Sequence, residues 1–367
     1  MTTLTYPTDK DILIFDAHCD TANVLPDQSD YFITKNQSHL AVEKIHKGGL
    51  NAQIFALWIN PLYAPFKPMK KALSLYNALE KSIFSLPWAK KVTSTIEMER
   101  ALQNNPLACW LSLEGGHIIE NRPENLDEFY SLGIRCMTLT HTKNTDWADS
   151  SGDSPRWDGL NKLGKEIVSK MEKMGMIIDI SHASDNTVED VLNTTSVPLM
   201  ASHSNARALC DIPRNLPDDF IKEIAERKGF IGINFYPGFL KKTIYKQLIT
   251  NLDKLKQDYH KSIKGNENDP DAFHRAEMKI YPKMVEGVDA IDLTAVIDHI
   301  LYIMDMGGID CVGLGSDFDG IPLTPSDLTD VSCYPSLIEG LSDNGLQKSE
   351  IRKIMGLNLF NFLKQFE

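Results

Sequence analysis

Short apolar runs recur along the whole chain, and most neighbouring pairs are separated by a stretch with the apolar spacing of an amphipathic helix. Several runs, such as MIIDIS and FIGINF, are apolar at nearly every position. Continuous apolarity is expected of strands in a parallel sheet that helices cover on both faces. The eight runs are Ile12–Ala17, Ala52–Trp58, Ala108–Leu113, Arg135–Thr140, Met176–Ser181, Pro198–Ser202, Phe230–Phe235 and Cys311–Ser316.

Eight strands that alternate with helices predict an α/β fold of the (β/α)8 TIM-barrel type. Asn161–Met174 illustrates the intervening helices, because its apolar residues lie three and four apart and Gly175 follows as a stop signal. The connection from Pro237 to Asp298, between the seventh and eighth strands, is long enough to hold extra helices. No repeat or linker divides the 367 residues, so we expect a single domain over residues 1–367.

Composition excludes several classes of partner. The net charge of −12 argues against binding to a nucleic-acid backbone, which needs a concentrated basic surface. No run approaches the ~18 apolar residues of a membrane span, and the first ten residues lack the apolar stretch of a signal peptide. Six widely spaced cysteines suggest neither a disulfide scaffold nor a zinc ribbon. We therefore expect a cytoplasmic protein with reduced thiols and no membrane partner.

Residues that bind metals or transfer protons stand where the apolar runs end. In parallel barrels the chemistry is concentrated at the carboxyl ends of the strands, so these side chains should meet at one rim. Each alone has an ordinary explanation, such as a turn, a loop ion pair or a core histidine, but all of them together favour a metal-dependent hydrolase. They are His18, Asp20, Glu114, His141, His182, His203 and Asp317.

The spacing of these residues favours two metal ions over one. His18 and Asp20 are two residues apart at the end of the first strand, so the strand period should turn both side chains to one side. His182 and His203 follow consecutive strands and should be neighbours. Glu114 would then bridge two zinc ions at the ~3.5–4 Å separation of two-metal sites. Asp317 remains open as a ligand or a general base.

Seven motifs, in the order DAHCD, LEGG, LTHTKNTDWADS, GMIIDISH, ASHSNAR, IPRNLPDD and GLGSDFDG, resemble the renal or membrane dipeptidase family of metal barrels. The resemblance spans residues 16–320, although Leu357 departs from the glycine of the family's closing segment and the long connection before residue 298 matches only weakly. It implies a binuclear zinc dipeptidase, usually a homodimer, that often accepts a D-residue at the C-terminal position of its dipeptide substrate.

Carried over by motif, the resemblance implies roles for individual residues. His141 and Arg214 correspond to substrate-binding residues and Asp317 to the acid/base. The remaining matches correspond to the zinc ligands, which are His18, Asp20, Glu114, His182 and His203.

Physical chemistry suggests how such residues would act. Two metals that share a water molecule lower its pKa, so that a bridging hydroxide is available near neutral pH to attack an amide carbonyl. Asp317 would accept the remaining proton and pass it to the leaving amine. His141 would stabilise the developing oxyanion. The planar fork of Arg214 matches the free carboxylate of a dipeptide.

Three further residues have more than one interpretation. Arg207 offers an alternative fork, although pairing with Asp211 or Asp218 is its expected use. Tyr236 and Trp147 could form part of the wall of the substrate pocket, although an aromatic residue at a barrel rim more often serves in packing. We include Tyr236 among the predicted substrate-binding residues.

Two rival functions fit the same metal ligands. One is another amidohydrolase-type reaction, such as hydrolysis of a cyclic amide, a lactone or a phosphoester. The other is a non-catalytic metal-binding barrel, which the presence of every expected ligand disfavours.

Overall fold

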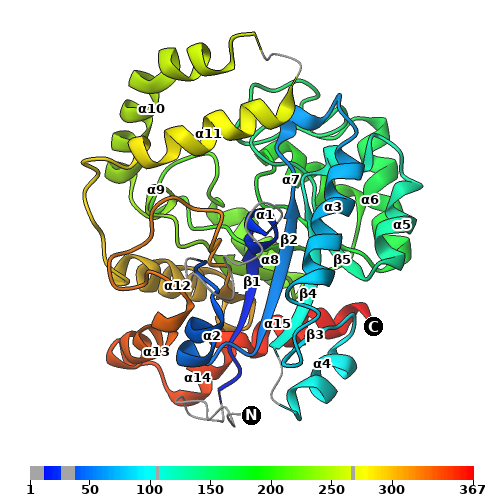
Figure 1. Ribbon diagram of the computed structural model, residues 1–367. Coiled ribbons are helices and arrows are strands. Elements are labelled where there is room, and N and C mark those ends of the chain that lie inside the picture. Colours follow the sequence, from blue (N-terminus) through cyan, green and yellow to red (C-terminus); the bar gives the residue numbers. More distant parts are fainter. Residues whose placement is uncertain (1–11, 26–37, 105–106, 266–268) are drawn as a thin grey trace.

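Nine parallel strands form the sheet of this protein in a computed structural model, which describes residues 12–25, 38–104, 107–265 and 269–367 (Figure 1). Because β2 pairs with both β1 and β4, eight of the strands close into a barrel, as the sequence predicted. The strands are β1 (Phe15–Cys19), β2 (Ala52–Trp58), β3 (Ala89–Lys91), β4 (Leu107–Glu114), β5 (Ile134–Thr138), β6 (Ile177–Asp179), β7 (Met200–Ala201), β8 (Phe230–Ile233) and β9 (Val312–Leu314).

Each of the eight predicted runs contains or overlaps one barrel strand, and the short strand β3 was not predicted. It pairs with Leu107–Cys109 of β4, whereas β5 pairs with β4 only from Leu111 onward. One edge of β4 is paired with β2 from Ala108 to Glu114. On the other edge, β3 therefore pairs with the part of β4 that β5 does not reach. Three residues with the sequence AKK carry too weak an apolar pattern to predict a strand.

Helices surround the barrel (Figure 1). The predicted helix at Asn161–Met174 is confirmed as α6, since Asn161 caps it by accepting from Gly164 N and Gly175 ends it in the left-handed conformation at φ 70°. The main helices are α2 (Val42–Gly48), α3 (Pro68–Lys81), α4 (Thr95–Leu102), α5 (Asn125–Ser131), α6 (Lys162–Met174), α7 (Asp185–Thr194), α8 (Asp218–Glu226), α12 (Thr294–Gly307), α13 (Tyr334–Asp343), α14 (Lys348–Arg352) and α15 (Asn358–Leu363).

Apolar side chains fill the lower half of the barrel. Phe15, Trp110 and Phe230 belong to one buried cluster with side chains from most of the other strands. Leu359 and Phe362 of α15 join the same cluster, because α15 crosses beneath the amino ends of the strands (Figure 1). The barrel floor is therefore a packed core, which leaves the carboxyl ends of the strands as the place for a site.

A β-bulge brings His18 into the barrel. Asp16 pairs with Gln53 and Cys19 pairs with Phe55, so three steps along β1 match two steps along β2. Ala17 belongs to the interior cluster, and simple alternation would turn the next residue outward. The extra residue instead lets His18 face inward, where its ring stacks on that of His203 at 3.8 Å.

The long connection after β8 holds helices, as predicted: α9 (Pro237–Leu240), α10 (Lys242–Ile263) and α11 (Pro270–Met284). The helices α10 and α11 lie beyond the carboxyl ends of the strands (Figure 1). The first turn of α11 reaches across to the segment after β2, where Asp271 accepts hydrogen bonds from Tyr63 and, at 3.0 Å, from Lys71. Among the described residues, no helix has both the length and the apolarity needed to cross a bilayer.

His299 ties α12 to the loops that carry site residues. It is fully buried, accepts from Ala206 N through Nδ1 at 3.1 Å and lies 3.1 Å from Leu240 O through Nε2. With Nδ1 as the acceptor, Nε2 is the donor and the ring is neutral. Burial lowers the pKa of His299 to about 4.

The variant His299→Gln tests this contact through the pH dependence of folding. The stabilisation from the neutral ring is fully present above the unfolded pKa near 6.5, and is lost as the pH falls toward the folded value of about 4. We expect the difference in unfolding free energy between wild type and variant to shrink by up to about 3 kcal/mol from pH 7 to pH 4 in denaturant titrations. His260→Gln, at an exposed position of α10, is the control. Parallel pH profiles for wild type and His299→Gln would contradict the assignment.

Candidate metal centre and active site

The seven predicted residues converge at the carboxyl ends of the strands. His18 lies in β1, Glu114 is the last residue of β4, and the other three histidines and Asp317 follow β5, β6, β7 and β9 within three residues. Asp20 reaches the site differently from the prediction, because β1 ends at Cys19 and Asp20 is the first residue of the turn into α1 (Thr21–Val24). Its position therefore depends on that turn and not on strand alternation.

Glu114 is the centre of the arrangement. Its Oε2 lies 3.4 Å from Nε2 of His18. Its Oε1 lies 3.3 Å from Nε2 of His182 and 3.4 Å from Nε2 of His203. The Nε2 of His141 is 3.8 Å from the same oxygen. The two oxygens of one buried carboxylate thus face two different sets of donor atoms.

Two acids extend the set around His18. The Nε2 of His18 lies 3.7 Å from Oδ2 of Asp20 and 4.0 Å from Oδ1 of Asp317. The described residues contain three clusters in which three donor atoms lie within 4.8 Å of one another. These clusters are His18–Glu114–His203, Glu114–His141–His182 and His18–Asp20–Asp317.

Several side-chain atoms that could bind a metal are buried at this centre without a hydrogen-bond partner. They include Nε2 of His18 and Oε2 of Glu114, and the two residues are only 1% and 2% exposed, so water does not reach these atoms either. Unpaired buried polar atoms are costly, and a cation between them would satisfy both. Imidazole nitrogens and carboxylate oxygens are also the ligands that zinc takes in proteins. The residues present therefore fit a metal centre.

The histidines on the Oε1 side of Glu114 are in the form that binds metals. Burial lowers the pKa of His182 and of His203 well below the usual value, and lowers the pKa of His141 to about 3. Their rings are neutral at physiological pH and keep a lone pair for an ion. His18 differs: burial alone would lower its pKa, but attraction to Glu114 and Asp20 outweighs burial and raises it.

Burial also disfavours the charged forms of the carboxyl groups, and it therefore raises their pKa values. Burial raises the pKa of Glu114, and the proximity of His18 only partly opposes this. Burial, with repulsion from Glu114, raises the pKa of Asp20 to about 6. Burial raises the pKa of Asp317 to about 7. Three acids in so small a buried space need cations to stay ionised together.

Asp179, inside the barrel below the histidines, orients His203. It accepts from the hydroxyl of Thr138 at 2.6 Å and from the hydroxyl of Ser202 at 2.5 Å. Because Ser202 gives its only proton to Asp179, its oxygen accepts from Nδ1 of His203 at 2.7 Å. The Nε2 of His203 is then the nitrogen without a proton, and it faces Glu114.

The loop after β5 holds His182 and His141 together. The backbone N–H of Ser151 donates to the carbonyl of His182 at 2.8 Å. The Ser150 hydroxyl contacts the carbonyls of both histidines. His182 itself has a φ of 66°, a left-handed conformation that is unusual for a residue other than glycine. Such backbone strain is typical of sites whose side chains must point in one direction.

Asp317 and Asp319 share this left-handed conformation, with φ of 64° and 66°, but have different surroundings. Oδ2 of Asp317 accepts from the side chain of Asn234 at 2.9 Å, while Oδ1 faces His18. Asp319 points away and accepts from the hydroxyl of Thr21 at 2.7 Å and from the backbone of His39 at 2.7 Å. Asp319 therefore fixes loops and is not among the candidate ligands.

Arg214 lies beside the metal centre. Its Nη1 donates to the Ser204 hydroxyl at 2.8 Å and its Nη2 to the backbone oxygen of His203 at 2.7 Å. Nε is buried without a partner, and within the described part of the chain no carboxylate is paired with the guanidinium. Burial lowers the pKa of Arg214 to about 10, so the group stays charged at neutral pH. It remains able to receive an anionic group.

Arg207, the alternative fork, is already occupied. Its two terminal nitrogens donate to Asp185 at 2.6 and 2.7 Å, and its Nε donates to the backbone of Asn215. The prediction that Arg207 pairs with an aspartate is confirmed, but the two aspartates proposed as its partner were wrong. Asp211 pairs with Lys242, and Asp218 accepts from Tyr302. The true partner comes from α7, which sequence distance does not reveal.

Of the two aromatic residues with two possible roles, Trp147 has the packing role. Trp147 is fully buried and packs over Gly116, where an added Cβ would lie 2.2 Å from its ring. It is a packing residue and not a pocket wall. Tyr236 is half-buried before α9 and lies 4.9 Å from the ring of Phe239. Trp58, the last residue of β2, lies 5.3 Å from the ring of His141.

Sequence reasoning missed Trp58, Asn234 and Asp179 at this site. A signal was present, because Asp179 and Asn234 are polar residues inside nearly continuous apolar runs. Trp58 also ends a strand, as the predicted ligands do.

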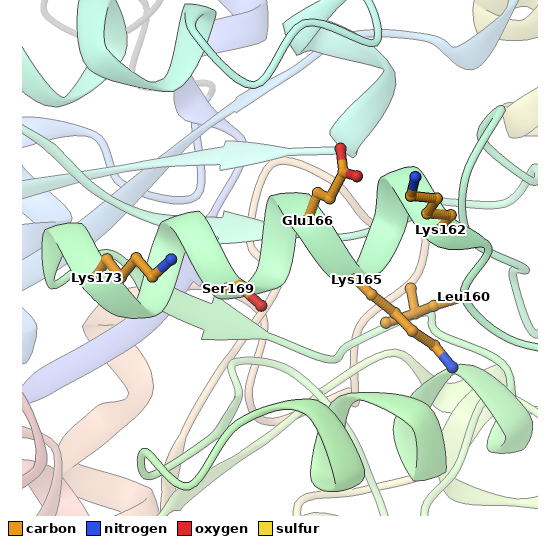
Figure 2. A pocket seen from close by; sticks show the side chains of 6 residues that line it. All are labelled: Leu160, Lys162, Lys165, Glu166, Ser169 and Lys173. Atoms are coloured by element: carbon orange, nitrogen blue, oxygen red, sulfur yellow. The ribbon is translucent and has the colours of Figure 1, made fainter.

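A hollow on the outer surface has no connection to these residues. It runs along α6 and is lined by Leu160, Lys162, Lys165, Glu166, Ser169 and Lys173 (Figure 2). Lys165 is paired with Asp190 at 2.9 Å, and none of the candidate ligands borders the hollow. The chemistry of the protein is therefore sought at the barrel rim.

The family model and the curated relatives that match this chain are all dipeptidases. Residues 8–367 match the family model described as membrane dipeptidase, peptidase family M19. The dipeptidase aclJ of Aspergillus oryzae is 31% identical over 334 residues, which are 88% of this chain and 69% of that protein. The chain spans 54% to 69% of the length of four curated dipeptidases that it matches.

Solved structures share the fold over nearly the whole chain. The probable dipeptidase PvdM of Pseudomonas aeruginosa has a TM-score of 0.83 and 25% identity, with 97% of this chain and 96% of that chain covered. A metallopeptidase of Rhodobacter sphaeroides, solved with a phosphinate mimic of the dipeptide L-Ala-D-Ala, has a TM-score of 0.78 and 22% identity, with 97% and 99% covered.

The variant Gly320→Ala tests whether Asp20 and Asp317 belong to the metal centre. An added Cβ would lie 2.1 Å from Oδ2 of Asp20 and 2.6 Å from Oδ1 of Asp317, so both acids must move. We expect affinity for Zn²⁺, measured by competition with a chromogenic chelator, to fall about tenfold or more. In Gly308→Ala the φ of 87° adds strain but no atom lies within 4 Å, so stability should fall and metal affinity should not. Unchanged affinity in Gly320→Ala would exclude Asp20 as a zinc ligand and would show that Asp317 is not one either.

Proposed function

The chain belongs to the membrane dipeptidase family, and on that basis we propose that it is a zinc-dependent dipeptidase that hydrolyses the peptide bond of free dipeptides. The observation that carries the proposal is the buried carboxylate of Glu114, whose two oxygens face His18 on one side and His182 and His203 on the other. A bridging carboxylate between two sets of ligands is the arrangement expected of a two-metal hydrolase.

In this proposal His18 and Asp20 would hold one zinc ion, His182 and His203 would hold the second, and Glu114 would contribute to both. When bound, the two ions supply Lewis acidity and make a hydroxide nucleophile available near neutral pH. The protein's contribution on this side is to keep the rings of His182 and His203 neutral and, through the contact of His203 with Ser202 and Asp179, to orient His203.

We assign the transfer of protons to Asp317. Its burial and its raised pKa of about 7 suit a group that must accept a proton and then release it near neutral pH. It takes the remaining proton of the attacking hydroxide as the oxygen bonds to the carbonyl carbon, and it gives that proton to the amide nitrogen as the carbon–nitrogen bond breaks. His141, a neutral donor 3.8 Å from Glu114, is assigned to the carbonyl oxygen as negative charge develops there.

We assign recognition of the dipeptide's free carboxylate to Arg214. Its guanidinium is charged, half-buried and without an acidic partner among the described residues, which leaves it available to a planar anion. Tyr236, which precedes α9 near Asp317, is proposed as part of the substrate wall. Acceptance of a C-terminal D-residue is proposed because the Rhodobacter sphaeroides metallopeptidase was solved with a mimic of L-Ala-D-Ala.

Hydrolysis of dipeptides by wild-type protein and by Arg214→Lys tests the proposal. Lysine keeps the charge but loses the fork, so we expect the KM for a free dipeptide to rise about tenfold to a hundredfold. The preference for a free dipeptide over its C-terminal amide should shrink in parallel. Arg207→Lys is the matched control, because Arg207 is occupied by Asp185.

The same assay checks the metal requirement. A chelator should abolish hydrolysis and added zinc should restore it. Turnover of lactones, cyclic amides or phosphoesters without turnover of dipeptides would favour the rival hydrolase reaction.

A further inference from the structure

Asn234 is a fully buried polar residue directly after β8, and neither the metal ligands nor the substrate groups assigned above include it. Its backbone is held by the side chain of Asn205. Oδ1 of Asn205 accepts from the N–H of Asn234 at 2.9 Å, and Nδ2 of Asn205 donates to the carbonyl of Asn234 at 3.0 Å. This reciprocal pair joins the loop after β7 to the end of β8 and leaves the Asn234 backbone no freedom to rotate.

The orientation of the Asn234 side-chain amide is also fixed. Its Oδ1 accepts from the backbone N–H of Tyr236 at 2.7 Å, and its Nδ2 donates to Oδ2 of Asp317 at 2.9 Å. A flipped amide would place its NH2 group against the N–H of Tyr236 and its oxygen against a carboxylate, so both contacts would become repulsive. Asn234 therefore always presents a donor to Asp317.

This contact makes the two oxygens of Asp317 inequivalent. Oδ2 is occupied by a neutral donor that cannot take up a proton. Oδ1 lies 4.0 Å from Nε2 of His18 and faces the metal centre. The backbone around Asp317 is constrained as well, since its N–H donates to the carbonyl of His18 at 3.2 Å and its φ is 64°.

We propose that Asn234 is a positioning residue that commits Asp317 to exchange protons through Oδ1 alone. This inference rests on the proposed function and deepens it. With Oδ2 held, Oδ1 takes the remaining proton of the attacking hydroxide as the new carbon–oxygen bond forms. The same atom returns it to the amide nitrogen as the carbon–nitrogen bond breaks. Without Asn234 the carboxyl group could turn, and its proton could reside on the oxygen that faces away from the reacting atoms.

The isosteric variant Asn234→Asp provides the sharpest test. It keeps an acceptor for the N–H of Tyr236, but it replaces the neutral donor to Asp317 by a second acidic group, so that Oδ2 of Asp317 faces a carboxyl oxygen. We expect kcat for a dipeptide to fall about tenfold to a hundredfold, while KM changes by less than about threefold and the bound zinc is retained. Asn234→Ser, which adds no charge, should show the same selective loss of kcat and serves if Asn234→Asp does not fold.

A double-mutant cycle with Asp317→Asn separates positioning from general damage. Asp317→Asn alone should lower kcat by about a hundredfold to ten-thousandfold. If Asn234 acts through Asp317, then Asn234→Asp should cause no further loss in that background. The matched control is Asn358→Asp, a buried asparagine at the barrel floor that donates to the carbonyls of Ile309 and Val312, and its kcat should stay at the wild-type level.

The outcomes are distinguishable. Equal losses of kcat in the wild-type and Asp317→Asn backgrounds, or a rise in KM with unchanged kcat, would overturn the role of Asn234. Wild-type protein that contains zinc but hydrolyses no dipeptide would overturn the proposed function, and the role of Asn234 with it.

Discussion

The structure depends on one electrostatic constraint, which is that the carboxylate of Glu114 is buried among four imidazoles and two further acids. Buried charges are costly without counter-charges, and the rings of His182 and His203 are neutral and supply none. His18, whose pKa is raised by Glu114 and Asp20, could supply one positive charge, but three buried acids surround it. Metal cations on both sides of Glu114 resolve this conflict, because they satisfy its two oxygens, the unpartnered Nε2 of His18 and the neighbouring acids together. The proposed chemistry follows from that requirement.

The barrel serves the centre by fixing side chains through a layer of polar residues that lies between the apolar floor and the ligands. Asp179 and Ser202 set the proton position of His203, and Asn205 and Asn234 set the orientation of Asp317. Asp179 ends β6, and the other three residues lie within four residues of the ends of β7 and β8, whose backbones are hydrogen-bonded in the sheet. The site can therefore be precise because the loops that carry its residues are tied to strand ends, even where His182 adopts a left-handed backbone conformation.

Much of this arrangement could be predicted because parallel strands leave simple patterns. Eight apolar runs predicted eight barrel strands, and polar residues at their ends predicted the rim. Features that depend on one extra residue or on distant pairing could not be predicted. The bulge that turns His18 inward and the pairing of Arg207 with Asp185 are of this kind. The cytoplasmic location, the homodimer and the roles of individual site residues stay predictions.

The most direct measurement is anomalous diffraction at the zinc absorption edge from crystals of the wild-type protein grown with zinc. The account predicts two peaks about 4 Å apart, one next to each oxygen of Glu114, with His18 and Asp20 at the first and His182 and His203 at the second. A single peak, peaks that do not flank Glu114, or no peak at this carboxylate would contradict it.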